Sequence, residues 1–363
     1  MKVLVINCGS SSAKYELFNM RDCRAITEGK IERIVKYSDY ARAIREIKDK
    51  LFKPGRHAIK SLSEIAGIGH RVVHGGEEFK DSTLITGKVI KSIDKFSELA
   101  PLHNPPSLAG IKACLKIFPG IPQVAVFDTA FHQSMPRYSY IYGIPYEFYK
   151  KFGIRRYGFH GTSHRYVAYK AAEILGKRLV HLKVVTVHLG NGCSMAAVLR
   201  GRSVDTSMGF TPLEGLLMGT RSGDIDPAII IYLMEKMKLS TKEMNDLLNK
   251  KSGLLGVSGI SNDMRDLLRY VKKGNSRARL ALNIFVYRIK KYIGAYASAM
   301  GGLDAVVFTA GIGERMKSIK DRIRRESGPV FGRNVEYMIV PTNEELLIAR
   351  DTSRIIKRLK RRK

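Results

Sequence analysis

The sequence contains 363 residues, of which 44% are hydrophobic, a composition typical of globular proteins and a length sufficient for two domains that each bury a core. Its 63 lysines and arginines outnumber 33 aspartates and glutamates, giving a formal net charge of +30, whereas its four cysteines form no C-x-x-C pair and so indicate neither a disulfide framework nor a zinc knuckle. The first apolar run is too short for a signal peptide and no uncharged apolar run approaches the length of a membrane span, so we expect a cytoplasmic protein without a membrane partner.

The first predicted element is a β-hairpin between residues 3 and 18. An apolar strand at 3–6 leads into the turn Asn-Cys-Gly-Ser-Ser-Ser and then into a second strand at 14–18. Small residues at the tip let backbone N–H groups and hydroxyls approach an anion, so the turn predicts a phosphate cradle, with an ordinary serine-rich turn as the alternative. It is not a Walker A loop, because Lys14 lies in a strand and not at the start of a helix.

Two segments farther along carry candidate ligand-binding side chains. In GHRVVHGGE, residues 69–77, strand alternation places Arg71 and Val73 on one face. Arg71 is suited to a bidentate pair with a carboxylate or phosphate, and a surface ion pair is the alternative. In PLHNPP, the two prolines predict a rigid loop around His103, outside helix and strand.

Two apolar strands end at polar groups, as expected where α/β sheets bind ligands. The strand at 124–127 ends at Asp128, and the strand at 305–308 runs into the glycine-containing segment 309–314. Both ends are therefore candidate parts of a binding site.

The hairpin pattern recurs in the second half of the chain. Residues 184–199 repeat the order of apolar strand, glycine-containing turn and second strand, and two such hairpins indicate a duplicated α/β architecture with a cleft between its halves. A basic and aromatic stretch follows Pro145 and marks the expected boundary. The predicted domains are 1–150, onto which a C-terminal helix at 343–363 packs back, and 151–342.

Three segments of the second half contain further candidates. His160 lies among glycines in RRYGFHGTSH, and His164 follows at a spacing that lacks the glutamate of an H-E-x-x-H zinc site, so we expect His164 to be structural. The long loop 205–227 carries Arg221 and is predicted to close over a transferring phosphoryl group. In PTNEELLIARD, Thr342 is the expected N-cap with Glu345 as its capping-box partner, which leaves Glu344 free for another role.

The positive charge is compatible with nucleic acid, an anionic membrane surface or small anionic substrates. It is spread over amphipathic stretches typical of solvated helix faces, and the C-terminal RLKRRK is the segment best suited to bind a polyanion. We therefore do not expect nucleic acid to be the main partner.

Ten motifs occur in the order found in acetate kinases, and the chain resembles that family over essentially its whole length. The motifs are NCGSSSAKYELF, GHRVVHGGE, APLHNPP, FDTAFHQSMP, RRYGFHGTSH, HLGNG, DTSMGFTPLEGLLMGTRSGDIDP, SGLLGVSGISNDMR, FTAGIGER and PTNEELLIARD. The resemblance implies the duplicated actin-like (ribonuclease H-like) fold shared with sugar kinases and the ATPase domain of heat-shock chaperones, with the active site in the cleft between two domains. It also implies reversible transfer of the ATP γ-phosphoryl group to acetate, in a homodimer that serves acetyl-CoA biosynthesis.

The resemblance also assigns roles position by position. It implies Asp128, His160 and Arg221 as catalytic residues. It implies Arg71 and His103 at the acyl substrate and the phosphoryl group, and an apolar methyl pocket of Val73, Leu102, Phe159 and Pro212. The implied nucleotide contacts are Lys14, Ser10, Ser12, His188, Leu189, Gly190, Asn191, Gly192, Asp263, Met264, Arg265, Gly311, Ile312, Gly313, Glu314 and Arg315. The implied ligands of Mg²⁺, with Mn²⁺ as an alternative ion, are Asn7 and Glu344.

The chemistry of the reaction is consistent with these roles. A carboxylate is already ionised at neutral pH, so the attacking group needs no general base. The obstacle is repulsion between two anions, which fixed positive charge from Arg71, Arg221 and magnesium and a hydrogen bond from His160 would reduce. We therefore expect Asp128 to orient a magnesium-bound water or Arg221 and not to abstract a proton.

Two alternatives remain open. A propionate or other short-chain acyl kinase differs mainly in pocket volume, and one methylene is worth only about 1–3 kcal/mol of discrimination. A basic nucleic-acid-binding protein on a kinase scaffold is the alternative from another class, and it predicts loss of the catalytic set that this sequence retains.

The chain also departs from the usual family pattern. It is shorter between residues 20 and 61 and between 313 and 341, and it is more basic than we expect of the family. Arg315 replaces a common asparagine and Cys193 a common alanine.

Overall fold

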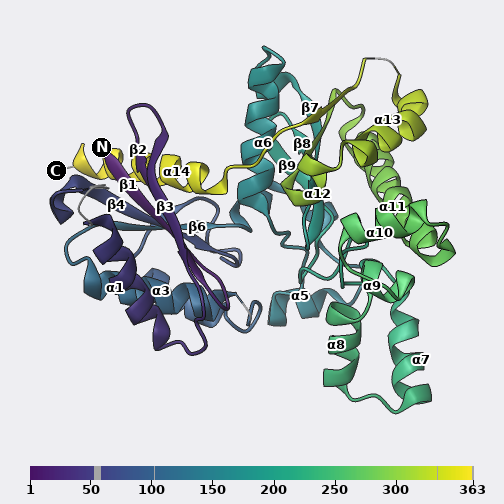
Figure 1. Cartoon of the computed structure of the whole chain (residues 1–363), viewed down its shortest axis with the longest axis horizontal. Helices are drawn as coiled ribbons and strands as arrows, with labels where there is room; N and C mark the ends of the chain where they lie inside the picture. The colour runs from purple at the N-terminus through teal and green to yellow at the C-terminus, as the bar shows by residue number, and fades with distance from the viewer. Residues whose placement is uncertain (53–58, 102, 333, 362–363) are drawn as a thin grey trace. The chain divides into compact units, whose positions relative to one another are not determined.

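The computed structural model describes residues 1–52, 59–101, 103–332 and 334–361. The chain forms two compact units, a first unit of Met1–Gln133 with Asn343–Lys363 and a second unit of Ser134–Thr342 (Figure 1). The division between residues 133 and 134 precedes the boundary expected between 150 and 151, and the C-terminal segment belongs to the first unit.

The described strands of the first unit form a six-stranded sheet in the order β3-β2-β1-β4-β6-β5. β1 (Lys2–Cys8) and β2 (Ala13–Asn19) are the predicted hairpin, with Asn7 opposite Lys14. β4 pairs with β1 in parallel and β6 pairs with β4 in parallel. The remaining strands are β3 (Arg24–Ile31), β4 (Ile65–Val72), β5 (Thr83–Leu84) and β6 (Gln123–Phe127).

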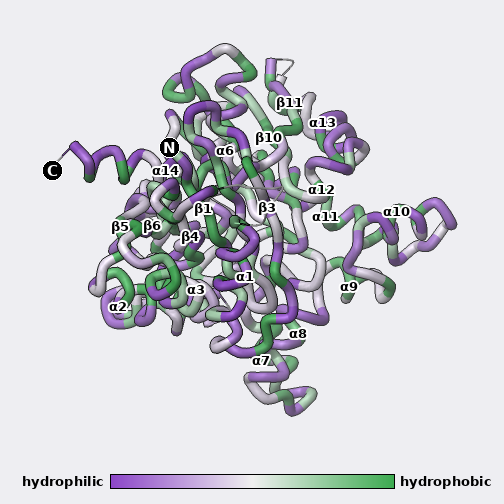
Figure 2. Tube along the Cα trace, turned by 60° about the vertical axis from the view of Figure 1, so that its left-hand side comes forward, coloured by the Kyte–Doolittle hydropathy of each residue, from purple (hydrophilic) through white to green (hydrophobic). Residues whose placement is uncertain are grey.

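Helices cover both faces of this sheet. α1 (Asp39–Leu51) and α3 (Asn104–Ile117) pack on the face where Leu4 and Ile6 are buried. α14 (Glu344–Lys360) packs on the other face, where a Cβ at Gly69 would lie 2.4 Å from Thr352 Oγ1. Glycine in β4 is therefore what lets α14 approach the sheet so closely. Figure 2 shows apolar and polar residues alternating along α14, as expected for a helix with one buried face.

The second unit repeats this topology. Its described strands form a five-stranded sheet in the order β11-β10-β7-β8-β9, in which β7, β8 and β9 are antiparallel neighbours and β10 is parallel to β7. The first unit has the same sequence of pairings in β1, β2, β3 and β4, so the predicted duplicated α/β fold is confirmed. The strands are β7 (Lys183–Leu189), β8 (Cys193–Leu199), β9 (Arg202–Thr206), β10 (Ala305–Thr309) and β11 (Glu336–Ile339).

Two helices flank the second sheet, α6 (Gly161–Ile174) on one side and the long α11 (Ser276–Met300) on the other (Figure 1). No described helix is long and apolar enough to cross a membrane. The remaining helices are α2 (Gly87–Lys95), α4 (Arg137–Tyr140), α5 (Tyr146–Phe152), α7 (Pro227–Met237), α8 (Thr241–Lys250), α9 (Gly253–Ser258), α10 (Met264–Lys272), α12 (Ala310–Arg315) and α13 (Lys317–Phe331), with 3₁₀ turns at Leu62–Glu64, Ala130–Ser134 and Leu179–His181.

Two local predictions are wrong. The prolines after His103 do not exclude a helix, because α3 begins at Asn104 and its first turn does not need their missing N–H groups. The N-cap of α14 is Asn343, whose side chain accepts from Leu346 N at 2.7 Å. Thr342 instead accepts a hydrogen bond from Ser163 Oγ at 3.0 Å.

Candidate active site

Three charged residues from separate segments meet in the first unit and form what we call the arginine cluster: Arg71, Asp128 and Glu344. Arg71 lies near the end of β4 and donates to Asp128 Oδ2 from Nη2 at 2.7 Å and from Nε at 3.1 Å. Asp128 directly follows β6, and its side chain is only 2% exposed. Glu344 begins α14, with Oε2 3.5 Å from Arg71 Nη1. The strand end at Asp128, one of the two predicted to bind ligands, therefore carries a compact, mostly buried ion-pair network.

Burial and the neighbouring charges shift the pKa values of two residues in this network. Burial raises the pKa of Glu344 to about 7, with Arg71 opposing the shift and Asp128 adding to it. Burial alone would lower the pKa of Arg71, but Asp128 and Glu344 hold it above the usual value. Arg71 is therefore a permanent cation, whereas Glu344 gains most from an additional positive charge nearby.

The tip of the β1–β2 hairpin lies in the same unit. Gly9 N donates to Ser12 O at 2.8 Å, and Tyr40 OH donates to Gly9 O, so the turn is fixed from two sides. Ser10 is exposed and Ser12 half-buried. The turn therefore presents at least the Ser10 side chain to solvent.

The residues expected to hold magnesium offer one amide and one carboxylate oxygen. Asn7 lies opposite Lys14 in the hairpin, and the charge of Lys14 lowers the pKa of Glu344. Among the described residues, no three His, Cys, Asp or Glu side chains lie close enough to hold a metal by themselves. Asn7 and Glu344 fit Mg²⁺, which commonly uses one or two protein oxygens and completes its shell with water and phosphate.

A chain of hydroxyls and imidazoles lies in the second unit. His164 Nδ1 is 2.8 Å from Thr186 Oγ1, His164 Nε2 is 2.7 Å from Ser194 Oγ, and Ser194 Oγ is 2.8 Å from His160 Nδ1. His160 precedes α6 with a left-handed φ of 54°, and its ring stacks on that of His188 at 4.2 Å. His188 Nδ1 in turn lies 2.9 Å from Ser163 Oγ. These bonds fix the plane of the His160 ring.

Arg221 lies beside the same glycine turn. A Cβ built at Gly192 would be 3.4 Å from Arg221 Nη1 and 3.5 Å from His160 Cε1, so both side chains reach this turn. Arg221 Nη1 donates to Pro212 O at 3.1 Å, and burial lowers the pKa of Arg221. A partly desolvated guanidinium next to His160 is a strong site for an anion.

The loop that carries Arg221 is fastened to the body of the second unit. Arg156 donates to Glu214 Oε1 at 2.5 Å, and Thr220 Oγ1 donates to Asn249 O at 2.9 Å. The position of Arg221 is therefore set by packing within the unit.

A cavity of about 260 Å³ lies near the Gly192 turn, and three of the predicted nucleotide-binding segments line it. Asp263 caps α10 and pairs with Arg265 at 2.5 Å, which keeps the pKa of Asp263 at about 2. Glu314 Oε1 accepts from Ala310 N at 2.9 Å and from Thr342 N at 3.0 Å, so its carboxylate stabilises the start of α12. The lining residues are Gly190, Asn191, Asn262, Asp263, Met264, Arg265, Gly311, Ile312, Arg315 and Met316.

Five further predicted residues fall into three groups. Val73 and His103 are half-buried in the first unit, whereas Phe159 (2% exposed) and half-buried Pro212 belong to the second. Leu102 lies outside the described residues. Ser12, Lys14 and Arg71 share the first unit with Val73 and His103, so each unit carries its own part of the predicted set.

The residues that support the histidines were not predicted from the sequence. Ser163, Thr186 and Ser194 each bond a histidine ring, and Asn262 and Met316 line the cavity. The available signal was strand alternation, which places Thr186 on the same face of its strand as His188.

The sequence matches the model of the Acetokinase family over residues 27–328. It is 53% identical to an acetate kinase of Halothermothrix orenii, over 98% of this chain and all of that one. The fold is similar to the crystal structure of Porphyromonas gingivalis acetate kinase, with a TM-score of 0.92, 43% identity and coverage of 98% and 99% of the two chains. It is also similar to that of a propionate kinase from Francisella tularensis, with a TM-score of 0.88, 42% identity and coverage of 97% and 99%. This protein therefore belongs to the acetokinase family.

Proposed function

We propose that this protein is a kinase that transfers the γ-phosphoryl group of ATP reversibly to acetate, giving acetyl phosphate and ADP. Membership of the acetokinase family over nearly the whole chain supports the reaction class. The proposal depends most on one observation. The side chains of Arg221 and His160 both reach the Gly192 turn, beside a cavity lined by the predicted nucleotide segments.

The first unit is assigned to the acyl substrate. Arg71 binds the acetate carboxylate. Asp128 holds the guanidinium in place by accepting hydrogen bonds from its Nε and Nη2. This role of Asp128 modifies our expectation from the sequence, since the arginine that it orients is Arg71. Val73, Leu102, Phe159 and Pro212 are assigned to the methyl group, and His103 to the phosphoryl group.

The second unit is assigned to the nucleotide and the transferring group. Phosphoryl transfer spreads negative charge over the equatorial oxygens, and Arg221 and His160 donate hydrogen bonds to them. The cavity beside Gly190 and Asn191 receives the nucleotide, with Asp263 and Arg315 at its wall.

The remaining assignments concern the metal, the assembly and the compartment. Asn7 and Glu344 are proposed to hold Mg²⁺, which neutralises charge on the β- and γ-phosphates when it is bound. Lys14, Ser10 and Ser12 support the triphosphate from the first hairpin. We also propose a cytoplasmic homodimer that supplies acetyl phosphate for acetyl-CoA biosynthesis.

The first test is Mg²⁺-dependent formation of acyl phosphate from ATP, trapped with hydroxylamine, with acetate, propionate and butyrate compared. We expect turnover to be fastest on acetate and kcat to fall by about 10³-fold or more in Arg221→Ala, because one fixed charge at the transition state is lost. Arg202→Ala, which removes an exposed arginine from β9, is the control and should retain full activity.

The outcomes separate the alternatives. Faster turnover on propionate would favour the propionate kinase activity named for the Francisella protein. Absence of turnover on every short acid, with intact nucleotide binding, would contradict the proposed reaction.

A further inference from the structure

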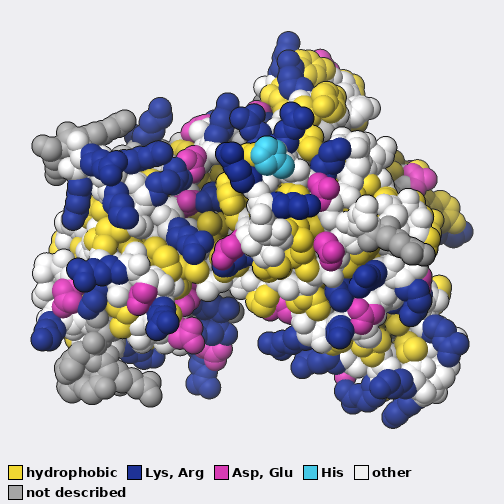
Figure 3. Space-filling model, turned by 90° about the horizontal axis from the view of Figure 1, so that it is seen from above, with side chains coloured by type: hydrophobic (Ala, Val, Ile, Leu, Met, Phe, Trp, Pro, Cys, Tyr) yellow, Lys and Arg dark blue, Asp and Glu magenta, His cyan; other side chains and the backbone are white. Residues whose placement is uncertain are grey.

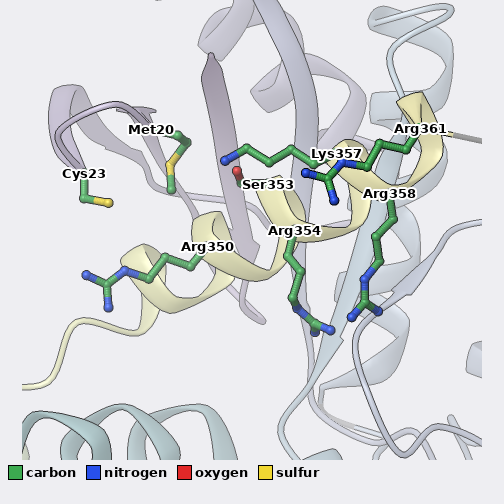
Figure 4. A pocket seen from close by; sticks show the side chains of 8 residues that line it. All are labelled: Met20, Cys23, Arg350, Ser353, Arg354, Lys357, Arg358 and Arg361. Atoms are coloured by element: carbon green, nitrogen blue, oxygen red, sulfur yellow. The ribbon is translucent and has the colours of Figure 1, made fainter.

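The outward face of α14 carries a row of cations that the proposed reaction does not use. Together with the β2–β3 turn it lines a hollow of about 420 Å³, which we call the basic groove (Figure 4). The lining residues are Met20, Cys23, Arg350, Ser353, Arg354, Lys357, Arg358 and Arg361. None of them is acidic.

Most of these cations form no ion pair with another described residue. Arg354 pairs with Asp81 at 2.8 Å and with Asp351 at 3.4 Å. Within the part of the chain that the structure describes, the other four cations of the groove form no ion pair; they are Arg350, Lys357, Arg358 and Arg361. Four like charges held on one helix face repel one another, and an anion shared between them removes that cost.

The helix dipole accounts for only part of this row. Cations in the last turn of a helix interact favourably with its C-terminal carbonyl groups, which explains Lys357 and Arg358. Arg350 lies well before the last turn, and its side chain extends toward the β2–β3 turn (Figure 4). The row from Arg350 to Arg361 covers about 16 Å of helix, a length along which one strand of nucleic acid presents several phosphates.

The chemistry of the groove favours a phosphate backbone. Arginine, which forms bidentate bonds with phosphate oxygens, provides most of the cations. Among the described residues, no aromatic side chain lines the groove, so bases have nothing to stack on. Met20 is the one large apolar side chain among these lining residues, too little for insertion into a bilayer. Figure 3 shows lysine and arginine side chains spread over the visible surface, in keeping with the excess of 63 lysines and arginines over 33 aspartates and glutamates.

We propose that the basic groove binds the phosphate backbone of nucleic acid without sequence specificity. This inference does not depend on the proposed kinase activity. The groove accounts for part of the net charge of +30, which a reaction between small anions does not explain.

The test compares two variants that each remove four positive charges, lowering the net charge from +30 to +26 (30 − 4). The groove variant combines Arg350→Gln, Lys357→Gln, Arg358→Gln and Arg361→Gln. The matched control combines Lys236→Gln, Lys238→Gln, Lys242→Gln and Lys251→Gln, all exposed in the second unit. Arg354 is left unchanged because it holds Asp81 and Asp351.

Binding is measured by fluorescence anisotropy of a labelled oligouridylate of about 20 nucleotides, at several KCl concentrations. We expect the groove variant to bind about 10-fold or more weakly at moderate salt. We also expect the slope of log K against log[salt] to fall by about 2 to 3, since each lost phosphate contact contributes about 0.7. The control should change affinity by less than about 3-fold, because its lysines lie outside the groove.

Three results would overturn the proposal. Equal weakening of both variants would show that binding depends on diffuse charge and not on the groove. Unchanged binding in the groove variant would place the contact elsewhere. Loss of binding to phosphatidylglycerol vesicles with unchanged RNA binding would identify a membrane surface as the ligand.

The circular dichroism spectrum and Tm of both variants, compared with the wild type, show whether they are folded, and none of the substituted residues belongs to the proposed catalytic machinery. If the fourfold groove variant does not fold, the double variant Arg350→Gln with Lys357→Gln provides the same comparison with about half the change in slope.

Discussion

Ser194 lies between two histidines, 2.8 Å from His160 Nδ1 and 2.7 Å from His164 Nε2. We expect Ser194→Ala to lower kcat about 10-fold, the equivalent of one hydrogen bond of about 1.4 kcal/mol, because the His160 ring loses a bond that orients it. KM for ATP and acetate should change little. Steady-state kinetics with trapped acyl phosphate measure both constants. Cys193→Ala is the control, since its thiol bonds Gly190 O and not a histidine, and equal losses in both variants would point to packing of the hairpin as the cause.

His70 is buried and bonds Gln123 Oε1 at 2.8 Å, and burial lowers the pKa of His70 to about 4. The unfolded chain, with a histidine pKa of about 6.5, therefore binds more protons than the folded chain between these two values. The buried, neutral His70 ring therefore makes its full contribution to stability above about pH 6.5. This contribution decreases as the pH falls toward 4, by about 2 kcal/mol between pH 7 and pH 5. Urea unfolding at pH 7 and pH 5, in wild type and His70→Gln, measures this change in the free energy of unfolding. An unchanged pH dependence in the variant would contradict a role for His70.

At the scale of elements, the packing of α14 on β4 depends on small residues in the strand. A Cβ at Gly69 would lie 2.4 Å from Thr352 Oγ1 and 2.6 Å from Ile348 Cγ2, so Gly69→Ala requires α14 to move. We expect a loss of about 1–3 kcal/mol and a fall in Tm of about 2 to 8 °C. Gly87→Ala at the start of α2 is the control, because no atom lies within 4 Å of its added Cβ, and its Tm should stay the same or rise slightly. Thermal unfolding followed by circular dichroism measures the Tm of both variants and of the wild type.

The elements also show where sequence patterns mislead. Two prolines after His103 predicted a loop, yet they occupy the first turn of α3, the one place in a helix where a missing N–H has no cost. Thr342 fits a capping box, but Ser163 donates to its hydroxyl and Asn343 caps α14 instead. In both cases the residues are compatible with two local structures, and contacts distant in sequence select one.

For the whole molecule, the dominant feature is the net charge of +30. Repulsion between like charges opposes the compact state, and salt screens it over a distance of about 10 Å at 0.1 M. We therefore expect Tm to rise by a few degrees when KCl is raised from about 20 to 300 mM. The fourfold lysine variant of the second unit, with less charge, should show a smaller rise. A Tm that is independent of salt in both proteins would show that local ion pairs compensate the net charge.

The sequence alone determined the duplicated α/β fold, the two hairpins and the candidate site residues, because strand alternation, glycine turns and motif order are local properties of the chain. The tertiary structure decided which of these residues touch. Arg71, Asp128 and Glu344 come from three distant segments, and only the pairing of β4 with β6 and the return of α14 bring them together. It also decided what supports the histidines, since Ser194 and Thr186 both bond His164 on another element. Strand alternation shows which face of a strand a residue occupies, but not which residue of another element it meets.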